Sequence, residues 1–466
     1  MTTHQTYYMK RTALLVFSGI MAMTISAQQL DRKELDDIRG SFSRTAETKA
    51  LQNIISNNRD IKSLALNRSV QGRTDHYFKY RVSVSGITDQ KQSGRCWMFT
   101  SMNVLRPAVM EKFGVKEFDF SHNYNYFWDM FEKSNLFLEN VIRTAGEDII
   151  MNRDVAFFFQ NPVSDGGVWN NFLNVADKYG VVPQSVMPET AHSDDTRSLN
   201  SILNERLRAG GYALREMMAD GATEAQARAA KLDIMKDVYR ILALCLGEPP
   251  TEFVWRYKTA DGEIKSLSST PLEFYRSIIP ADYDAESYIM IMHDPTREYY
   301  KVYEIENYRN TVEGVNWRYL NLPLDEIKSA AIASIKANEA MYASCDVAKY
   351  YNPEGISDPK MYDYESLFGV RLDMDKKARI LTRQSGSSHA MTLIAVDTDE
   401  NDRPVKWEFE NSWGDKACHG GYLTFTDRWF DEYMFRLVIN RKYLSDKADK
   451  AADSKPVMLP AWDYMF

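Results

Sequence analysis

Residues 90–97, Gln-Lys-Gln-Ser-Gly-Arg-Cys-Trp, lead directly into an apolar run that continues to residue 105. The run predicts a buried helix and places Cys96 at its start. Unpaired backbone N–H groups and the positive end of the helix dipole favour the thiolate of a cysteine there, which is the form a nucleophile needs. For an isolated cysteine the commoner interpretation is a small buried hydrophobic side chain. The assignment therefore depends on residues elsewhere in the chain.

The composition is that of an ordinary globular protein, with 466 residues, 44% hydrophobic and 26% charged. This length exceeds one simple core and indicates two or three lobes. A net charge of −8 argues against nucleic-acid binding, which needs a basic surface. The four cysteines, Cys96, Cys245, Cys345 and Cys418, are too few for a disulfide scaffold and have no metal-ligand spacing. We therefore expect no metal and no cofactor.

Residues 1–27 have the pattern of a signal peptide. Lys10 and Arg11 precede an apolar run over residues 12–27, which ends in Ile-Ser-Ala. A basic start, a short apolar centre and small residues at the end are typical of such a peptide. The run is also shorter than the roughly 20 apolar residues that span a bilayer. We expect a soluble protein that is exported to the periplasm or the extracellular space and keeps no membrane anchor. The alternative is an N-terminal helix of the core.

The rest of the chain divides into a helical part and a β-rich part. Residues 194–246 predict a helical hairpin in which Gly210 and Gly211 interrupt the first helix. Residues 405–410 alternate in polarity, which predicts a strand with one buried face. This order predicts an α+β fold with the functional site in the cleft between the two parts. We expect a signal peptide (1–27), an N-terminal arm (28–75), a helical lobe with Cys96 (76–193), a helical and hairpin insertion (194–320), a β-rich lobe (321–455) and a C-terminal arm (456–466).

The β-rich part supplies the partners that a nucleophilic Cys96 needs. His389 opens one apolar strand, and Asn411 ends the strand that follows. A histidine at a strand mouth can accept the thiol proton, and an asparagine on the next strand can fix the imidazole tautomer and ring plane. Trp413 would shield their hydrogen bond from water. Each residue alone is commoner in a structural role, but together with Gln90 the ordered set predicts nucleophilic catalysis.

These motifs resemble those of the papain-like cysteine peptidases, and most closely those of the bleomycin hydrolase/aminopeptidase C branch. The likeness spans roughly residues 75–466 and is carried by dispersed sequences that include Ser93-Gly-Arg-Cys-Trp97, Asp165-Gly-Gly167, Asn411-Ser-Trp-Gly414 and Leu459-Pro-Ala-Trp-Asp463. The resemblance implies a papain-like two-lobed fold with a helical lobe and a β-barrel-like lobe. It also implies large helical insertions and a C-terminal arm that lies in the cleft.

The resemblance assigns a role to each residue of the catalytic set. It implies that Cys96 is the nucleophile, that His389 is the general acid and base, and that Asn411 orients the imidazole. Gln90 and the backbone N–H of Cys96 are implied as the oxyanion hole, and Trp97 and Trp413 as supporting residues. The implied reaction is hydrolysis of peptide bonds in short peptides through a thioester intermediate.

Substrate binding is implied for the backbone of Gly166 and Gly167 and for the terminal carboxylate of Phe466. In this family the carboxylate pairs with the free amino group of the substrate, so residues are removed from the N-terminus. Tyr464 stands where the family usually has proline, and the sequence stops at Phe466 without a few further small residues. We expect an aminopeptidase. A dipeptidyl peptidase or an endopeptidase is the alternative, because a shorter arm leaves more room.

The resemblance also implies a homohexamer, whereas the DNA binding described for some relatives is not expected at this net charge. Two other classes of function stay open. One is a catalytically silent relative that serves as a binding or scaffold protein. The other is a different thiol acyl-transfer enzyme, such as a transglutaminase-like enzyme, although Asn411 in place of an acidic third member argues against it.

Overall fold

The computed structural model describes residues 29–84, 86–279 and 287–464. The predicted signal peptide at residues 1–27 and the C-terminal Phe466 lie outside these residues. The contacts within the chain divide it into two units, Met1–Leu66 and Asn67–Phe466. Within the described ranges, no helix is long and apolar enough to cross a membrane.

The first unit consists of short helices in its described part: α2 (Arg32–Ser41), α3 (Ala46–Ser56) and α4 (Ile61–Leu64). Asp31 caps α2, because its side chain accepts the N–H of Glu34 and the Glu34 side chain accepts the N–H of Asp31. None of the residues in these helices is buried. The apolar side chains of Ile38 and Ile54 are 53% and 55% exposed. The described part of this unit therefore has no hydrophobic core of its own.

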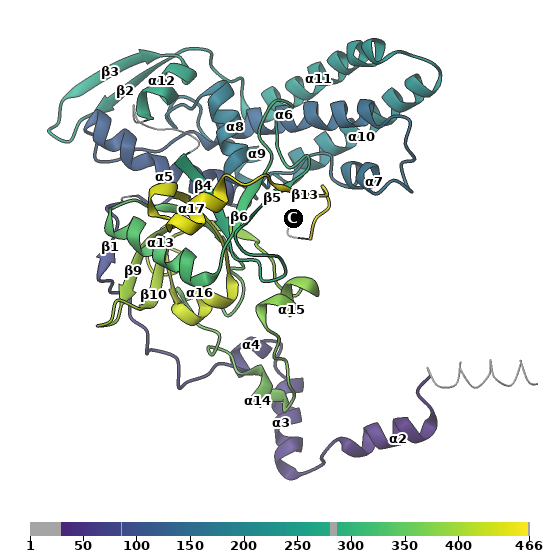
Figure 1. The fold of residues 1–466 in the computed structure, drawn as a ribbon, viewed down its shortest axis with the longest axis vertical. Helices are drawn as coiled ribbons and strands as arrows, with labels where there is room; N and C mark the ends of the chain where they lie inside the picture. The colour runs from purple at the N-terminus through teal and green to yellow at the C-terminus, as the bar shows by residue number, and fades with distance from the viewer. Residues whose placement is uncertain (1–28, 85, 280–286, 465–466) are drawn as a thin grey trace, which may run out of the picture. The chain divides into compact units, whose positions relative to one another are not determined.

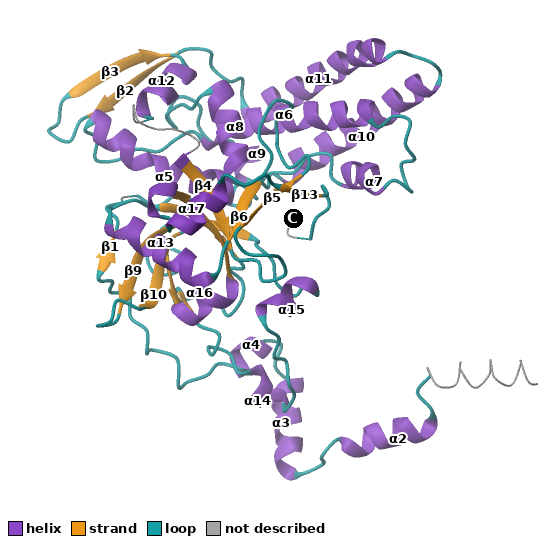
Figure 2. Ribbon diagram, viewed as in Figure 1, coloured by secondary structure: helices purple, strands orange, loops and turns teal. Residues whose placement is uncertain are grey.

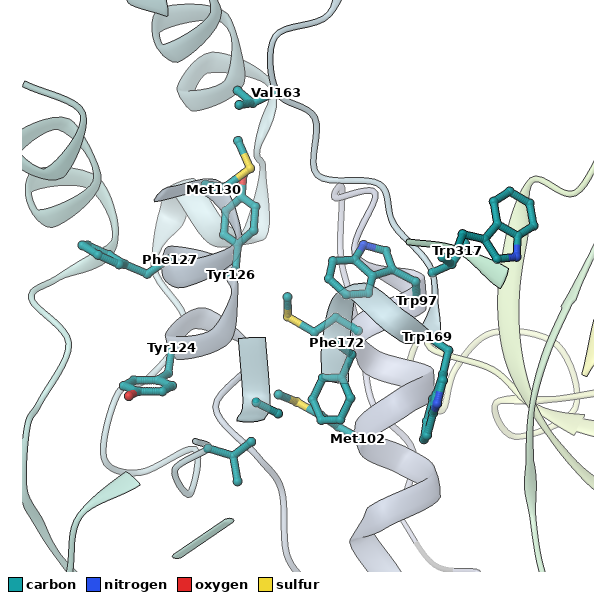
Figure 3. Close-up of a cluster of buried hydrophobic side chains, with 14 of the residues drawn as sticks. Trp97, Met102, Tyr124, Tyr126, Phe127, Met130, Val163, Trp169, Phe172 and Trp317 are labelled. Atoms are coloured by element: carbon teal, nitrogen blue, oxygen red, sulfur yellow. The ribbon is translucent and has the colours of Figure 1, made fainter. Parts of the chain in front are cut away.

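The second unit begins with a helical part that is gathered on one side of the strands (Figure 2). Its helices are α5 (Cys96–Phe113), α6 (His122–Arg143), α7 (Arg153–Gln160), α8 (Trp169–Tyr179), α9 (Ala191–Asp194), α10 (Arg197–Ala219), α11 (Glu224–Leu246) and α12 (Pro271–Ile278). A hairpin of β2 (Phe253–Lys258) and β3 (Ile264–Ser269) precedes α12. Trp97 from α5, Phe127 from α6 and Phe172 from α8 belong to one buried cluster (Figure 3). This shared core fixes the start of α5.

Gly210 and Gly211 do not interrupt the helix, because α10 runs through both of them. A Cβ at Gly211 would lie 3.1 Å from the ring of Phe137 on α6, and one at Gly210 would lie 2.9 Å from Ile234 on α11. The two glycines therefore let α10 approach its neighbours closely, and the predicted break was wrong. The sequence shows the small residues but not the helices that press against them.

The other part of the second unit is a sheet of 11 strands in the order β13-β5-β6-β4-β12-β7-β9-β10-β11-β8, with β1 beside β9. Figure 1 shows β4, β5, β6, β9 and β10 of this sheet below α6 and α8. Its strands are β1 (Tyr80–Arg81), β4 (Tyr288–Met292), β5 (Lys301–Ile305), β6 (Arg318–Asn321), β7 (Met341–Cys345), β8 (Ile356–Ser357), β9 (His389–Thr398), β10 (Pro404–Glu410), β11 (Tyr422–Thr426), β12 (Met434–Asn440) and β13 (Val457–Leu459). The connecting helices are α13 (Leu324–Lys336), α14 (Tyr364–Phe368), α15 (Lys376–Leu381), α16 (Asp427–Tyr433), η2 (Arg441–Tyr443) and α17 (Asp446–Ala452).

The segment 194–320 contains the expected helices and hairpin, and it also contributes β4, β5 and β6 to the large sheet. β4 reads Tyr-Ile-Met-Ile-Met, a short apolar run without alternation. Such a run does not distinguish a buried strand from a piece of buried helix. Its place in the sheet depends on β12 and β6, which lie beside it.

The predicted α+β class is confirmed, and the packing of one helix on one strand creates the candidate site. β9 pairs with β7 and β10 and is buried along nearly its whole length. α5 packs against β9. Because α5 begins with Cys96 and β9 begins with His389, this packing brings the two residues to one place.

Candidate active site

The loop before Cys96 is held by the fully buried side chain of Arg95. Its guanidinium donates to the carbonyl of Ser193 at 2.6 Å and to the hydroxyl of Ser93 at 3.0 Å. It also lies 3.0 Å from a carboxylate oxygen of Glu189. These contacts fix the backbone that presents Cys96. The sequence assigned no role to Arg95, because two of its partners, Ser193 and Glu189, lie about a hundred residues away in the chain.

Cys96 is the first residue of α5, and its sulfur accepts a hydrogen bond from the N–H of Ala390 at 3.5 Å. Burial raises the pKa of the Cys96 thiol to about 11, although the N–H groups of Ala390 and Trp97 act to lower it. Burial also lowers the pKa of His389 to about 4, although the hydrogen bond with Asn411 acts to raise it. The expectation of a thiolate favoured by the helix end is corrected here, because the loss of water outweighs it. Burial therefore favours the uncharged thiol and the neutral imidazole, which can accept the thiol proton.

The contact between His389 and Asn411 fixes the imidazole tautomer. The Nε2 atom of His389 lies 2.8 Å from the side-chain oxygen of Asn411, which directly follows β10. Because the Asn411 oxygen also accepts the N–H of Ser412 at 2.8 Å, it acts as an acceptor and His389 Nε2 is the donor. The lone pair is then on Nδ1, the nitrogen left for the Cys96 thiol. The ring of Trp413 packs beside the imidazole at 5.0 Å between centroids.

Gln90 is joined to the same loop as Asn411. Its side-chain oxygen accepts the hydroxyl of Ser412 at 2.6 Å, and its backbone N–H donates to the Ser412 carbonyl at 2.9 Å. Its amide nitrogen donates to the Ser93 carbonyl at 2.6 Å. A primary amide has two hydrogens, and within the described residues only this one has a partner. One amide hydrogen is therefore left for another acceptor, and the role of Gln90 in an oxyanion hole stays a prediction.

Asp165 connects the Cys96 loop to the glycine loop. Its carboxylate accepts the N–H of Gly94 at 2.6 Å, and its carbonyl accepts the indole N–H of Trp97 at 2.7 Å. A Cβ at Gly94 would lie 2.5 Å from that carboxylate, and a Cβ at Gly167 would lie 2.7 Å from the indole ring of Trp97. Both glycines are thus required by close packing. The sequence showed Asp165 only as the first residue of the Asp165-Gly-Gly167 motif.

Gly166 differs from Gly167 in both packing and hydrogen bonding. A Cβ at Gly166 would meet no atom closer than 3.7 Å. Its carbonyl already accepts a hydrogen bond from the ammonium of Lys133 at 2.7 Å. The same ammonium lies 2.7 Å from the buried carboxylate of Asp129. Gly167 is therefore the better placed of the two glycines to pair its backbone with a peptide.

Two cavities lie along this backbone. The first has a volume of about 180 Å³ and is lined by Cys96 and His389 together with Gly166 and Gly167. The second has a volume of about 230 Å³, shares the two glycines, and extends to Ala461 of the C-terminal arm. The reactive pair therefore opens onto a groove that the arm borders.

The C-terminal arm is fixed beside this groove by backbone and side-chain contacts. β13 pairs in parallel with β5. The carboxylate of Asp463 forms an ion pair with Arg297, and the hydroxyl of Tyr464 contacts that of Thr296. The substrate-binding role predicted for Phe466 falls outside the described residues and stays a prediction. Among the residues that are described, no cluster of His, Cys, Asp and Glu side chains is arranged to hold a metal ion.

Comparisons with known proteins agree with this arrangement. The sequence profile of the Peptidase C1-like family matches residues 29–466. Human bleomycin hydrolase is 38% identical over 419 residues, which are 87% of this chain and 91% of that protein. Aminopeptidase C of Lactobacillus delbrueckii subsp. lactis is 38% identical over 398 residues, which are 84% of this chain and 88% of that protein. The crystal structure of PepW from Lactobacillus rhamnosis superimposes with a TM-score of 0.89 at 36% identity, covering 94% of this chain and 99% of that one.

Proposed function

Because the chain belongs to the Peptidase C1-like family and is a cysteine peptidase, we propose that it acts as an aminopeptidase on short peptides. The resemblance to the bleomycin hydrolase/aminopeptidase C branch is confirmed by its relatives. Membership in this family favours an enzyme over a silent scaffold protein. The relatives named aminopeptidase C support removal of residues from the N-terminus.

In the proposed reaction the Nδ1 atom of His389 accepts the proton of Cys96 as the sulfur attacks the scissile carbonyl. The Cys96 N–H and the second amide hydrogen of Gln90 stabilise the oxyanion, and such donors are commonly worth about 3–4 kcal/mol each. The imidazolium then protonates the leaving amine, and the Asn411 oxygen keeps its ring plane fixed. His389 next activates the water that hydrolyses the thioester.

The position of the C-terminal arm is the observation that supports cleavage from the N-terminus. The arm is tied to the sheet through β13 and Asp463. Ala461 borders the cavity that Gly166 and Gly167 also line. An arm at this place limits how far a peptide can extend beyond the scissile bond on its amino side. Substrates with few residues on that side are therefore favoured.

Cleavage of matched peptides with free and acetylated N-termini tests this proposal. We expect free peptides to be shortened stepwise and acetylated ones to resist. Equal cleavage of both would contradict the aminopeptidase. Cys96→Ala should abolish cleavage, whereas Cys245→Ala, which removes a thiol outside the site, should not. Both variants should keep the melting temperature near that of the parent protein.

A dipeptidyl peptidase or an endopeptidase is the second candidate. It is favoured by the cavity of about 230 Å³ between the glycine loop and Ala461, which offers room beyond the first residue. Mass spectrometry of the products separates the candidates. Single amino acids indicate an aminopeptidase, dipeptides a dipeptidyl peptidase, and internal fragments an endopeptidase.

Export and assembly into a homohexamer belong to the same proposal. The basic and apolar pattern of residues 10–27 supports export. The exposed apolar side chains of α2 and α3, including Ile38 and Ile54, support packing against another copy. Sequencing the N-terminus of the protein from fractionated cells tests export, with Gln28 expected first. Light scattering during gel filtration tests assembly, and a mass of one chain would contradict it.

A further inference from the structure

A buried arginine lies in the cavity that contains the reactive pair. Arg436 is on β12, in the otherwise mostly apolar sequence Met-Phe-Arg-Leu-Val-Ile-Asn. It lines the cavity of about 180 Å³ together with Cys96 and His389, and it is 5% exposed. The reaction described above uses the cysteine and the histidine but gives this guanidinium no task.

Arg436 has no hydrogen bond or ion pair with any described residue. Its Nε atom is buried without an acceptor. Its guanidinium lies 4.1 Å from the ring centroid of Trp317. Its neighbours across the sheet are Met292 on β4 and Ser344 on β7, and neither is acidic. The titratable side chains near it are Tyr342, Tyr308, Tyr319 and Cys96, and burial raises the pKa of each, which favours their uncharged forms.

The other buried arginines among the described residues have partners. Arg95 pairs with Glu189, Arg106 pairs with Glu410 at 2.6 Å, and Arg379 pairs with Glu432. Arg215 donates to backbone carbonyls. Arg436 stacks on the ring of Trp317, but its Nε donor is left without an acceptor. A buried charge without an anion or a hydrogen-bond acceptor is costly, so proteins rarely keep one without a ligand or a function. Burial accordingly lowers the pKa of Arg436.

The cavity wall suits an anion. No aspartate or glutamate is among its lining residues in the described part of the chain. Ser344, Ser387 and Ser388 line it beside Arg436 and add neutral hydroxyl groups. A planar guanidinium in a site of this kind is matched best by a carboxylate, which it can bind through two parallel hydrogen bonds.

We propose that Arg436 binds the carboxylate of an aspartate or glutamate side chain on the amino side of the scissile bond and makes the enzyme prefer acidic peptides. This inference rests on the proposed function, because it takes the groove along Gly167 as the place of the peptide. In an aminopeptidase the acidic residue is the single residue before the scissile bond, and in the alternative dipeptidyl peptidase it is the first or the second residue before that bond. Losing one partner of such a buried pair reduces affinity by roughly 10- to 100-fold.

Coumarin amides of short peptides test the inference, because they carry no terminal carboxylate and isolate the side chain. Glu, Gln, Leu and Lys are placed at the first position in one series and at the second position in another. We expect kcat/KM for Glu to exceed that for Gln by roughly tenfold or more in one series. Equal values for Glu and Gln in both series would overturn the inference. This comparison uses the unaltered protein and needs no variant to fold.

Variants of Arg436 test the residue itself. Arg436→Gln should bring the ratio of Glu to Gln close to one, Arg436→Lys should keep part of it, and Arg436→Glu should turn the preference toward Lys. Arg318→Gln is the matched control, because it removes the same charge from an exposed site on β6. A Glu preference that survives in a folded Arg436→Gln protein would overturn the inference.

Two further readouts distinguish binding of a substrate carboxylate from an effect on the thiol and from a loss of all peptidase activity. If Arg436 acts only through the Cys96 thiol, then Arg436→Gln shifts the pH dependence of iodoacetamide alkylation and slows all substrates equally, which would overturn the inference. If the unaltered protein cleaves none of the amides and no free peptide, the proposed function itself fails. Cleavage without an acidic preference refutes only the inference about Arg436.

Discussion

Replacing Asn411 with alanine tests the catalytic geometry through a single hydrogen bond. The substitution removes the oxygen that lies 2.8 Å from Nε2 of His389 and leaves this N–H without an acceptor in a buried place. An unsatisfied buried donor costs about 1–3 kcal/mol. The imidazole relieves this cost by rotating, and the same energy is then needed to restore the productive orientation. At 1.36 kcal/mol for each factor of ten, kcat/KM falls roughly 5- to 160-fold.

The assay measures kcat and KM on a coumarin amide together with the alkylation rate of Cys96 by iodoacetamide. We expect kcat to carry most of the loss, because Asn411 touches the imidazole and not the groove. Asn411→Asp keeps an acceptor oxygen and should retain more activity than Asn411→Ala. Its carboxylate should also raise the pKa of His389.

Asn401→Ala is the control, because it makes the same substitution at an exposed turn. If Asn411→Ala stays within about twofold of this control while both proteins are folded, the orienting role of Asn411 is refuted. The error range of a few tenths of a kcal/mol that is usual for such comparisons corresponds to less than twofold.

Three further predictions concern acidity and packing. Because burial lowers the pKa of His389 to about 4, kcat/KM should rise with pH through about 4 and not through the usual range near 6.5; an acid limb above pH 6 would contradict this. Gly167→Ala should lower the free energy of unfolding by about 1–3 kcal/mol, because its Cβ meets the ring of Trp97 at 2.7 Å. Gly166→Ala should change the free energy of unfolding by under about 0.5 kcal/mol. Denaturant titration measures both values. Burial raises the pKa of Glu408 to about 7, so the folded protein gains stability from the bound proton at pH below about 4.5 and loses it as pH rises through 7. Glu408→Gln should remove this loss, which amounts to at most about 3 kcal/mol, and pH-dependent unfolding curves that coincide for the two proteins would contradict it.

The sequence predicted the reactive residues because their positions follow from local patterns. Cys96 opens an apolar helix and His389 opens an apolar strand, and the structure places both where those patterns put them. The short alternating run that became β10 likewise predicted the place of Asn411. Each of these inferences needs only a few neighbouring residues, so a single sequence is sufficient.

The sequence did not predict the contacts that depend on distant segments. In the sequence Arg95 is only one residue of a motif, and its contacts with Ser193 and Glu189 are visible only in the structure. Gly210 and Gly211 indicated a break because helix propensity counts against glycine. The approach of α6 and α11 reversed that interpretation. Such contacts arise from tertiary packing, which overrides local preference without leaving a local signal.

The protonation states of Cys96 and His389 also depend on distant segments of the chain. The position of Cys96 at the N-terminal end of α5 is a local feature, and the dipole of the helix favours the thiolate there. The loss of water around the thiol is a property of the whole fold, and it dominates because desolvation of a charge outweighs a partial dipole. Arg436 is buried in the same way, with 5% of its surface exposed, so its charge is weakly screened. A sequence pattern can thus identify which groups react, whereas their protonation, and the preference for acidic substrates that we propose for Arg436, depend on how completely the fold buries these groups.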